Sequence, residues 1–187
     1  YKHFWGDYDH YLLSHAWYPR EIRITRNDPE IHSWRDAQSF RRMPGFDGKD
    51  YYQKENTFKL NVVEIDAYIF HYGFVRPPYL IQKKRKNHNT NYAGQQSTDE
   101  MFKDEADSFD YGDLSKIKRY KENYPRVMQN FIKKFNWKDQ LHYKKYDRKT
   151  KLQKHEKLKY RLLTLFEQTF LNGNLLFGFK NYYKLKK

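Results

Sequence analysis

His71 stands where a strand is expected to end, and an imidazole can bind a metal or move a proton near neutral pH. Residues 59–78 read KLNVVEIDAYIFHYGFVRPP, and the side chains alternate in type from Val63 to Phe70. This period of two predicts one strand, with His71 next in the row of Val63. Sheets often present functional side chains where strands end. His71 is therefore a candidate site residue, and a partly buried histidine bonded to backbone is the alternative.

A second group of chemically capable side chains lies in residues 17–41. Residues 21–26 alternate charged or polar side chains with Ile and predict a strand, and Asn27–Pro29 predicts a turn. Residues 31–34 can return as a second short strand. The expected hairpin offers a set of aromatic, basic, acidic and amide side chains: Trp17, Tyr18, Arg23, Arg26, Asp36 and Gln38. Core packing and cross-strand pairing are the alternatives for these residues.

Several segments occur in a recognisable order, beginning with WYPREIRITRN, IHSWRDAQSFR and IDAYIFHYGFVRPP. Later come SFDYGDL, NYPRVM with Asn136-Trp137 after it, and FGFKNYYKL. Together they resemble the C-terminal half of bacterial family 2 glycosyltransferases with the GT-A fold. The resemblance implies transfer of a sugar from a nucleotide-sugar donor to a glycan or lipid-linked acceptor in cell-envelope polysaccharide biosynthesis. It also implies a divalent metal, Mn or Mg, and a cytoplasmic location.

The same family carries its nucleotide-binding βαβ units and an acidic DxD-type metal motif in an N-terminal half. The sequence has no glycine-rich phosphate loop and no long βαβ pattern. Asp7 and Asp9 have DxD spacing but lie in an aromatic stretch, where surface or turn acids are the alternative. We therefore expect part of a longer catalytic domain. The expected fold is α/β, α+β-like as a fragment: the C-terminal half of a GT-A type mixed sheet, followed by a helical basic tail.

The resemblance suggests roles for the candidate residues. Asp36 is the candidate base that deprotonates the acceptor hydroxyl, and a helix cap or ion pair is its alternative. His71 is the candidate metal ligand, and its neutral imidazole would suit Mn better than Mg. The remaining candidates are substrate-binding residues: Trp17 and Tyr18 for stacking on a sugar, Arg23 and Arg26 for a phosphate or carboxylate, Gln38 for a sugar hydroxyl, and Arg76 and Lys83 for the diphosphate.

Charge divides the chain. The net charge is +14, yet residues 1–113 carry 16 Lys and Arg against 18 Asp and Glu. Residues 114–187 carry 21 Lys and Arg against 5 Asp and Glu. With the motifs, this predicts a catalytic half-domain at 1–86, a polar connection at 87–113 and a basic helical region at 114–187.

Helix signals are local. In the connection we expect one short helix at 99–106. In the basic region we expect helices in the segment that starts at Pro125 and in residues 158–171, which Asn172-Gly173 should end.

Composition leaves other classes open. The chain has no cysteine, which excludes disulfides and cysteine metal clusters and fits a reducing compartment. No apolar run approaches a membrane span, but the cationic residues 144–159 could rest on anionic lipid at the inner face of the membrane. A basic nucleic-acid-binding protein is one alternative function, although no recognised nucleic-acid motif is present. A structural half-domain without activity is another.

Overall fold

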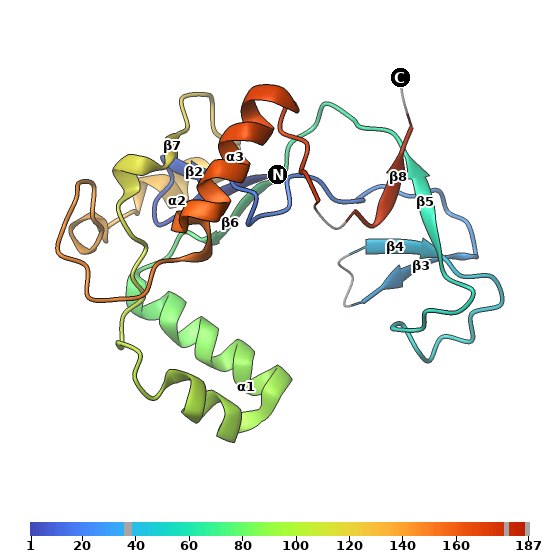
Figure 1. Ribbon diagram of the computed structural model, residues 1–187, viewed down its shortest axis with the longest axis horizontal. Coiled ribbons are helices and arrows are strands. Elements are labelled where there is room, and N and C mark those ends of the chain that lie inside the picture. Colours follow the sequence, from blue (N-terminus) through green and yellow to red (C-terminus); the bar gives the residue numbers. More distant parts are fainter. Residues whose placement is uncertain (36–38, 178–179, 186–187) are drawn as a thin grey trace.

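The structure is a computed structural model, which describes residues 1–35, 39–177 and 180–185. These residues form a mixed α/β arrangement with two four-stranded sheets and three α-helices. Figure 1 shows the first sheet and the helices on one side and the second sheet on the other. The expected α/β class is therefore confirmed at this level.

The first sheet has the strand order β6-β1-β2-β7. Its strands are β1 (Lys2–Trp5), β2 (His10–Leu12), β6 (Phe70–Phe74) and β7 (Lys118–Arg119). β1 and β2 pair antiparallel, as do β2 and β7, whereas β6 joins β1 in parallel. The parallel pairing brings His71 beside the start of the chain.

The second sheet has the order β3-β4-β5-β8. Its strands are β3 (Ile31–Trp34), β4 (Ser39–Arg42), β5 (Phe58–Val62) and β8 (Tyr182–Lys184). β4 pairs antiparallel with β3 and β5, and β8 adds in parallel to β5. The second sheet therefore takes its last strand from the end of the chain.

The expectation of one strand from Lys59 to His71 is wrong. β5 belongs to the second sheet and β6 to the first, so residues 63–69 have to cross between the sheets. The alternating apolar side chains in this crossing are exposed: Val63 is 63% and Ile65 55% accessible. Alternation here does not reflect a buried face, because no strand continues through these residues.

The expected hairpin is confirmed only in its second half. The turn forms, with the Ile31 amide donating to the Asp28 carbonyl at 3.0 Å, and residues 31–34 form β3. Residues 21–26 are not a strand. β3 pairs instead with β4, whose Ser39 lies opposite Trp34.

Helix α1 (Pro78–Phe102) replaces most of the expected polar connection. It is two helices joined at Gly94, whose backbone (φ 83°, ψ 168°) suits glycine alone. Thr98 connects the second helix to the first. Its hydroxyl donates to the Gly94 carbonyl at 2.9 Å and accepts a hydrogen bond from the Asn89 side-chain amide at 3.0 Å. These contacts stabilise a helical hairpin that composition did not indicate.

The basic region is helical only in part. Its described residues form α2 (Gln129–Lys133), α3 (Leu158–Phe170) and four short 3₁₀ helices: η1 (Leu114–Lys116), η2 (Arg126–Met128), η3 (Lys138–Gln140) and η4 (Lys154–Glu156). Pro125 precedes η2, and α3 is followed by Asn172 and Gly173 at positive φ, as expected. Among the described residues, no helix is long and apolar enough to cross a membrane.

The hydrophobic core lies on the first sheet. Its fully or nearly buried members come from β1, β2 and the segments that cover them: Phe4, Trp5, Tyr8, Tyr11, Leu12, Val75, Ile81, Phe109, Tyr111, Leu114, Tyr120, Trp137 and Leu141. Trp5 donates its indole N–H to the Tyr111 carbonyl at 2.9 Å, and Trp137 donates to the Gly6 carbonyl at 2.9 Å. The core thereby fixes β1, which carries one side of the candidate site.

Candidate functional site

Two histidines from distant parts of the chain meet on the first sheet. His3 on β1 is the register partner of His71 on β6, so the parallel strands place both side chains together. Their Nδ1 atoms are 3.1 Å apart. Burial lowers the pKa of His3 to about 4, and burial together with the charge of Lys84 lowers the pKa of His71. Both rings are therefore neutral at pH 7.

Their hydrogen bonds assign the proton positions. The His3 Nε2 atom lies 2.8 Å from the Tyr18 carbonyl, which can only accept, so a neutral His3 carries its proton on Nε2. The Nδ1 atom of His3 must then accept, and His71 Nδ1–H donates to it. The consequence is that His71 Nε2 has no proton and presents its lone pair, as a proton acceptor or metal ligand requires.

Aromatic rings surround His3. Tyr1 stacks on it with ring centroids 5.3 Å apart, Trp17 lies at 5.1 Å and Tyr18 meets it edge-on at 4.8 Å. Arg23 donates its Nε–H to the Tyr1 hydroxyl and lies over the same ring. The structure thus gathers four residues that the sequence analysis proposed for a site: Trp17, Tyr18, Arg23 and His71. Together with Tyr1 and His3 we call these residues the histidine cluster.

Gly73 gives the His71 ring its space. A Cβ atom on Gly73 would lie 2.7 Å from His71 Nε2, closer than any normal contact. The carbonyl of Gly73 accepts a hydrogen bond from Lys84 Nζ at 3.1 Å. Burial, followed by the charge of Arg76, lowers the pKa of Lys84. A glycine and a cation of α1 thus lie beside the unprotonated nitrogen of His71.

The other sequence candidates lie outside the histidine cluster. Arg76 is exposed just before α1, and its carbonyl accepts from the Tyr111 hydroxyl at 2.9 Å. Lys83 is exposed on α1, and Arg26 is exposed on the connection from β2 to β3. Asp36 and Gln38, proposed as the base and a sugar contact, fall outside the described residues.

Sequence reasoning missed His3, Gly73 and Lys84. The spacing His71-Tyr72-Gly73 was a usable signal, because a glycine two residues along a strand lies on the same face as the histidine. No local pattern marks His3, since its role depends on a partner 68 positions away. Lys84 is one of four consecutive cations at residues 83–86, and nothing in the sequence distinguishes it from the other three.

The histidine cluster does not by itself fit a divalent metal. Mn and Mg favour oxygen-rich ligand sets, but the side chain that His71 contacts is another imidazole, that of His3. In the described part of the chain no group of three or more His, Asp or Glu side chains could hold a metal. The expected metal ligand role of His71 therefore lacks companions here, and we derive no metal-dependent step.

Asp7 and Asp9 are engaged in structural contacts. The Asp7 carboxylate accepts from the backbone amides of Asp9 and His10 and lies 2.9 Å from His10 Nδ1. The Tyr143 hydroxyl donates to it as well, at 2.9 Å. Asp7 therefore stabilises the turn between β1 and β2, and Asp9 belongs to the same turn.

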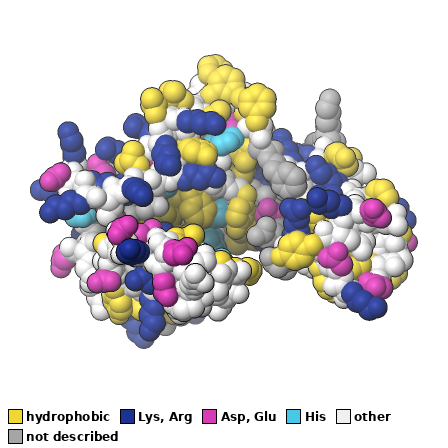
Figure 2. Space-filling view, turned by 60° about the horizontal axis from the view of Figure 1, so that its bottom comes forward, with side chains coloured by type: hydrophobic (Ala, Val, Ile, Leu, Met, Phe, Trp, Pro, Cys, Tyr) yellow, Lys and Arg dark blue, Asp and Glu magenta, His cyan; other side chains and the backbone are white. Residues whose placement is uncertain are grey.

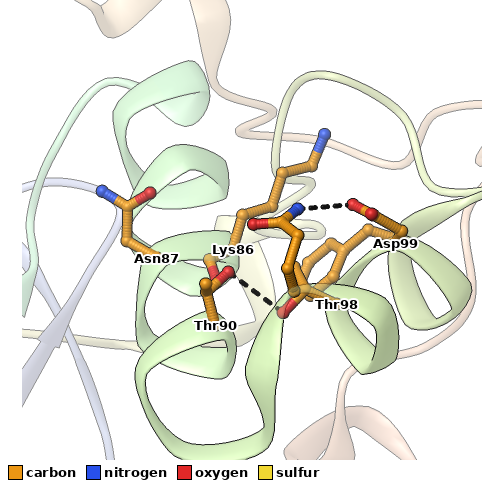
Figure 3. A pocket seen from close by; sticks show the side chains of 7 residues that line it. Lys86, Asn87, Thr90, Thr98 and Asp99 are labelled. Atoms are coloured by element: carbon orange, nitrogen blue, oxygen red, sulfur yellow. Dashed lines mark hydrogen bonds between the residues drawn. The ribbon is translucent and has the colours of Figure 1, made fainter.

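A separate hollow lies in the α1 hairpin and has a volume of about 260 Å³. Figure 3 shows its polar lining, in which the hydroxyls of Thr90 and Thr98 bond at 3.1 Å and Gln95 donates to Asp99 at 2.7 Å. Four of the polar side chains thus bond in two pairs, and the lining includes none of the candidate residues. The histidine cluster is the better candidate for chemistry.

Comparison with protein-family models, with curated proteins and with solved structures found no match for this chain.

Proposed function

We propose that this chain is the acceptor-side part of a glycosyltransferase, which transfers a sugar from a nucleotide-sugar donor to a glycan or lipid-linked acceptor. The observation that carries the proposal is the meeting of Trp17, Tyr18, Arg23 and His71 around His3. These residues come from two of the segments that resemble family 2 glycosyltransferases. We further propose a cytoplasmic location, where such donors and a cysteine-free chain are both expected.

The aromatic side of the histidine cluster would bind the sugar. Tyr18 is 41% exposed, and its ring offers a flat apolar face of the kind that packs against a pyranose. Arg23 bonds the Tyr1 hydroxyl, and the Tyr1 ring meets Tyr18 edge-on at 5.1 Å, so the three side chains are neighbours. A guanidinium can bind a phosphate or carboxylate with two parallel hydrogen bonds. The two groups together would recognise a sugar that carries negative charge nearby.

The basic side would act on hydroxyls and phosphates. His71 Nε2 would accept a hydrogen bond from a sugar hydroxyl, because its lone pair is fixed by the bond to His3. Lys84 and Arg76 would stabilise the charge that develops on a diphosphate leaving group. Asp36 stays our proposed base, and Gln38, Arg26 and Lys83 stay proposed contacts, on sequence grounds alone.

Calorimetric titration with UDP- and GDP-sugars, with and without Mn²⁺, tests the proposal. Because the sequence has no glycine-rich phosphate loop to hold a nucleotide, we expect only weak, saturable binding of a donor through its sugar and diphosphate, and a further loss of about tenfold in affinity for His71→Ala, the size of one good hydrogen bond. The matched control is His88→Ala, which removes an exposed histidine of α1. Failure of every donor to bind, or equal binding by His71→Ala, would contradict this placement of the site.

A further inference from the structure

Helix α3 is held to the protein by one face. The His15 amide donates to the Thr164 hydroxyl at 2.9 Å, and His15 Nδ1 lies 2.6 Å from a carboxylate oxygen of Glu167. Glu167 is 1% exposed and also accepts from the Leu176 amide at 2.7 Å. These contacts fix which way the helix faces.

The opposite face of α3 is apolar and exposed. Residues at i, i+4, i+7, i+8 and i+12 share a face, and here they are all large and hydrophobic. Their exposed fractions range from 44% to 70%: Leu158, Leu162, Leu165, Phe166 and Phe170. Figure 2 shows hydrophobic side chains projecting where α3 lies, with Lys and Arg side chains gathered just beneath them. A helix was expected here from the sequence, and the structure shows that its apolar face is not covered by any described part of the chain.

A basic segment runs directly into this helix. Residues 144–161 contain nine Lys and Arg against two acids, Asp147 and Glu156. Glu156 is bonded to Arg148 and to the Gln153 amide at 2.6–2.7 Å, which anchors η4 next to α3. The cations closest to the helix are exposed: Lys151, Lys154, Lys157, Lys159 and Arg161.

Two of these cations border the apolar face. At 3.6 residues per turn, Arg161 lies just outside one edge of the stripe, next to Leu165, and Lys159 lies at the other edge, in line with Phe166 and Phe170. Long Lys and Arg side chains in such positions extend past buried apolar groups toward an anionic surface. The helix therefore combines an apolar stripe with a positive border.

We propose that α3 docks on an anionic lipid bilayer, lying in the plane of the surface with its apolar face at the boundary between headgroups and acyl chains. An anionic bilayer satisfies both features, since it attracts the cations and accepts the leucines and phenylalanines. A second copy of the chain would bring a like-charged border against this one. A nucleic acid would use the cations and leave the apolar stripe in water. The inference does not rest on the proposed glycosyl transfer.

Vesicle co-sedimentation tests the docking. We expect binding to vesicles of phosphatidylcholine with about one-third phosphatidylglycerol and weaker binding to phosphatidylcholine alone, by about tenfold or more. Leu162→Gln with Phe166→Gln should weaken the binding to anionic vesicles by about tenfold. Lys157→Gln with Lys159→Gln should weaken it by a similar factor, and raised salt should lower it further.

Matched variants control for the loss of exposed apolar area and of charge elsewhere. Val127→Gln with Phe131→Gln removes two exposed apolar side chains near α2, and Lys49→Gln with Lys54→Gln removes two cations beside the second sheet. Neither pair should change vesicle binding by more than about twofold. Because all four residues are exposed, loss of folding is not expected, and circular dichroism checks it.

A fluorescent label reports how the helix lies. The chain has no cysteine, so Phe170→Cys can carry a polarity-sensitive dye at one position. We expect a blue shift on anionic vesicles and quenching by lipids brominated in the upper acyl chain. The proposal is overturned if the dye does not respond while the protein is bound, or if neutral and anionic vesicles bind alike. It is also overturned if light scattering shows a dimer that Leu162→Gln with Phe166→Gln dissociates and no vesicles bind.

Discussion

The first and second sheets each contain three strands joined by antiparallel pairing and one edge strand that pairs in parallel, β6 in the first sheet and β8 in the second. They differ in what they bury. The first sheet packs Phe4, Trp5 and other aromatic rings into a continuous core. The second buries Met43 and Trp34 next to polar groups, including Arg41, whose guanidinium bonds Asn181 and lies 4.4 Å from the Trp34 ring.

This difference predicts unequal stability. Large aromatic side chains contribute the most apolar area per residue, so the first sheet has the stronger driving force. In the second sheet, Arg41 Nε and the Ser39 hydroxyl are buried and have no hydrogen-bond partner among the described residues, which costs free energy. We infer that the second sheet opens locally while the first stays folded. The histidine cluster lies on the more stable of the two.

Truncation of one tryptophan in each sheet should show the largest effect. Trp5→Ala should lower the free energy of unfolding by about 3–5 kcal/mol, because Trp5 is 2% exposed and its removal leaves a cavity and an unpaired Tyr111 carbonyl. Trp34→Ala should instead raise hydrogen exchange in β3, β4 and β5 alone. Denaturant unfolding and amide exchange measure the two effects, with Phe58→Ala, an exposed residue of β5, as the control. Equal global destabilisation by both truncations would mean that the sheets unfold as one unit.

The second largest effect is expected from acid, which should lower the free energy of unfolding of the first sheet. Burial lowers the pKa of both His3 and His155 to about 4, and the His155 ring meets Trp5 edge-on at 4.9 Å. The unfolded chain binds these protons from pH 6.5 downward and the folded chain does not, so stability falls as pH drops from about 6.5 to about 4. Each histidine should cost about 2 kcal/mol at pH 5.

Thermal unfolding between pH 7 and pH 5 measures this loss. The variant His155→Leu removes one titrating group whose Nε2 has no partner in the described part of the chain, so its melting temperature should depend less on pH than that of the parent chain. A pH dependence that is as steep in the variant would rule out His155 as a source. The exchange of second-sheet amides serves as an internal reference over the same range.

Local features were predictable from the sequence, whereas long-range pairing was not. Helix α3 and the turn before β3 follow from periodicity, Asn, Gly and Pro, which act within a few residues. The sequence does not show that β5 and β6 belong to different sheets. Side chains alternate in the same way whichever sheet a strand joins. Helix α1 was expected only at its end, since residues 99–102 fall within the short helix expected at 99–106: its Asn, Thr and Gly residues favour other structures, and contacts such as Thr98 to Asn89 stabilise it.

The candidate site divides in the same way. His71, Trp17, Tyr18 and Arg23 were found because histidine, aromatic and arginine residues stand near expected strand ends and turns. His3 was not, because its role arises only from the parallel pairing of β1 with β6. The proton assignment on His71 depends on that partner and on the Tyr18 carbonyl, and neither contact has a signature in the sequence.

The smallest expected effect concerns the join between β5 and β8. Glu64 follows β5 and forms ion pairs with Lys184 of β8 and with Arg20, which lies on the connection from β2 to β3. The hydrogen bond from Lys184, followed by the one from Arg20, lowers the pKa of Glu64. Glu64→Gln should therefore cost the second sheet about 0.5–1 kcal/mol, a range that reflects the partial exposure of all three side chains. Amide exchange in β5 and β8 measures it.

The pH dependence of this effect separates it from that of the histidines. A lowered carboxyl pKa stabilises the fold above the unfolded value of about 4.5, and the contribution is lost as pH falls below it. The difference between Glu64→Gln and the parent chain should hence stay constant from pH 7 to pH 5 and shrink only at lower pH or in high salt. Glu55→Gln, an exposed acid before β5, is the control. A Glu64→Gln effect that appears equally in β1 and β2 would show that the two sheets are coupled through this join, contrary to the independence inferred from their cores.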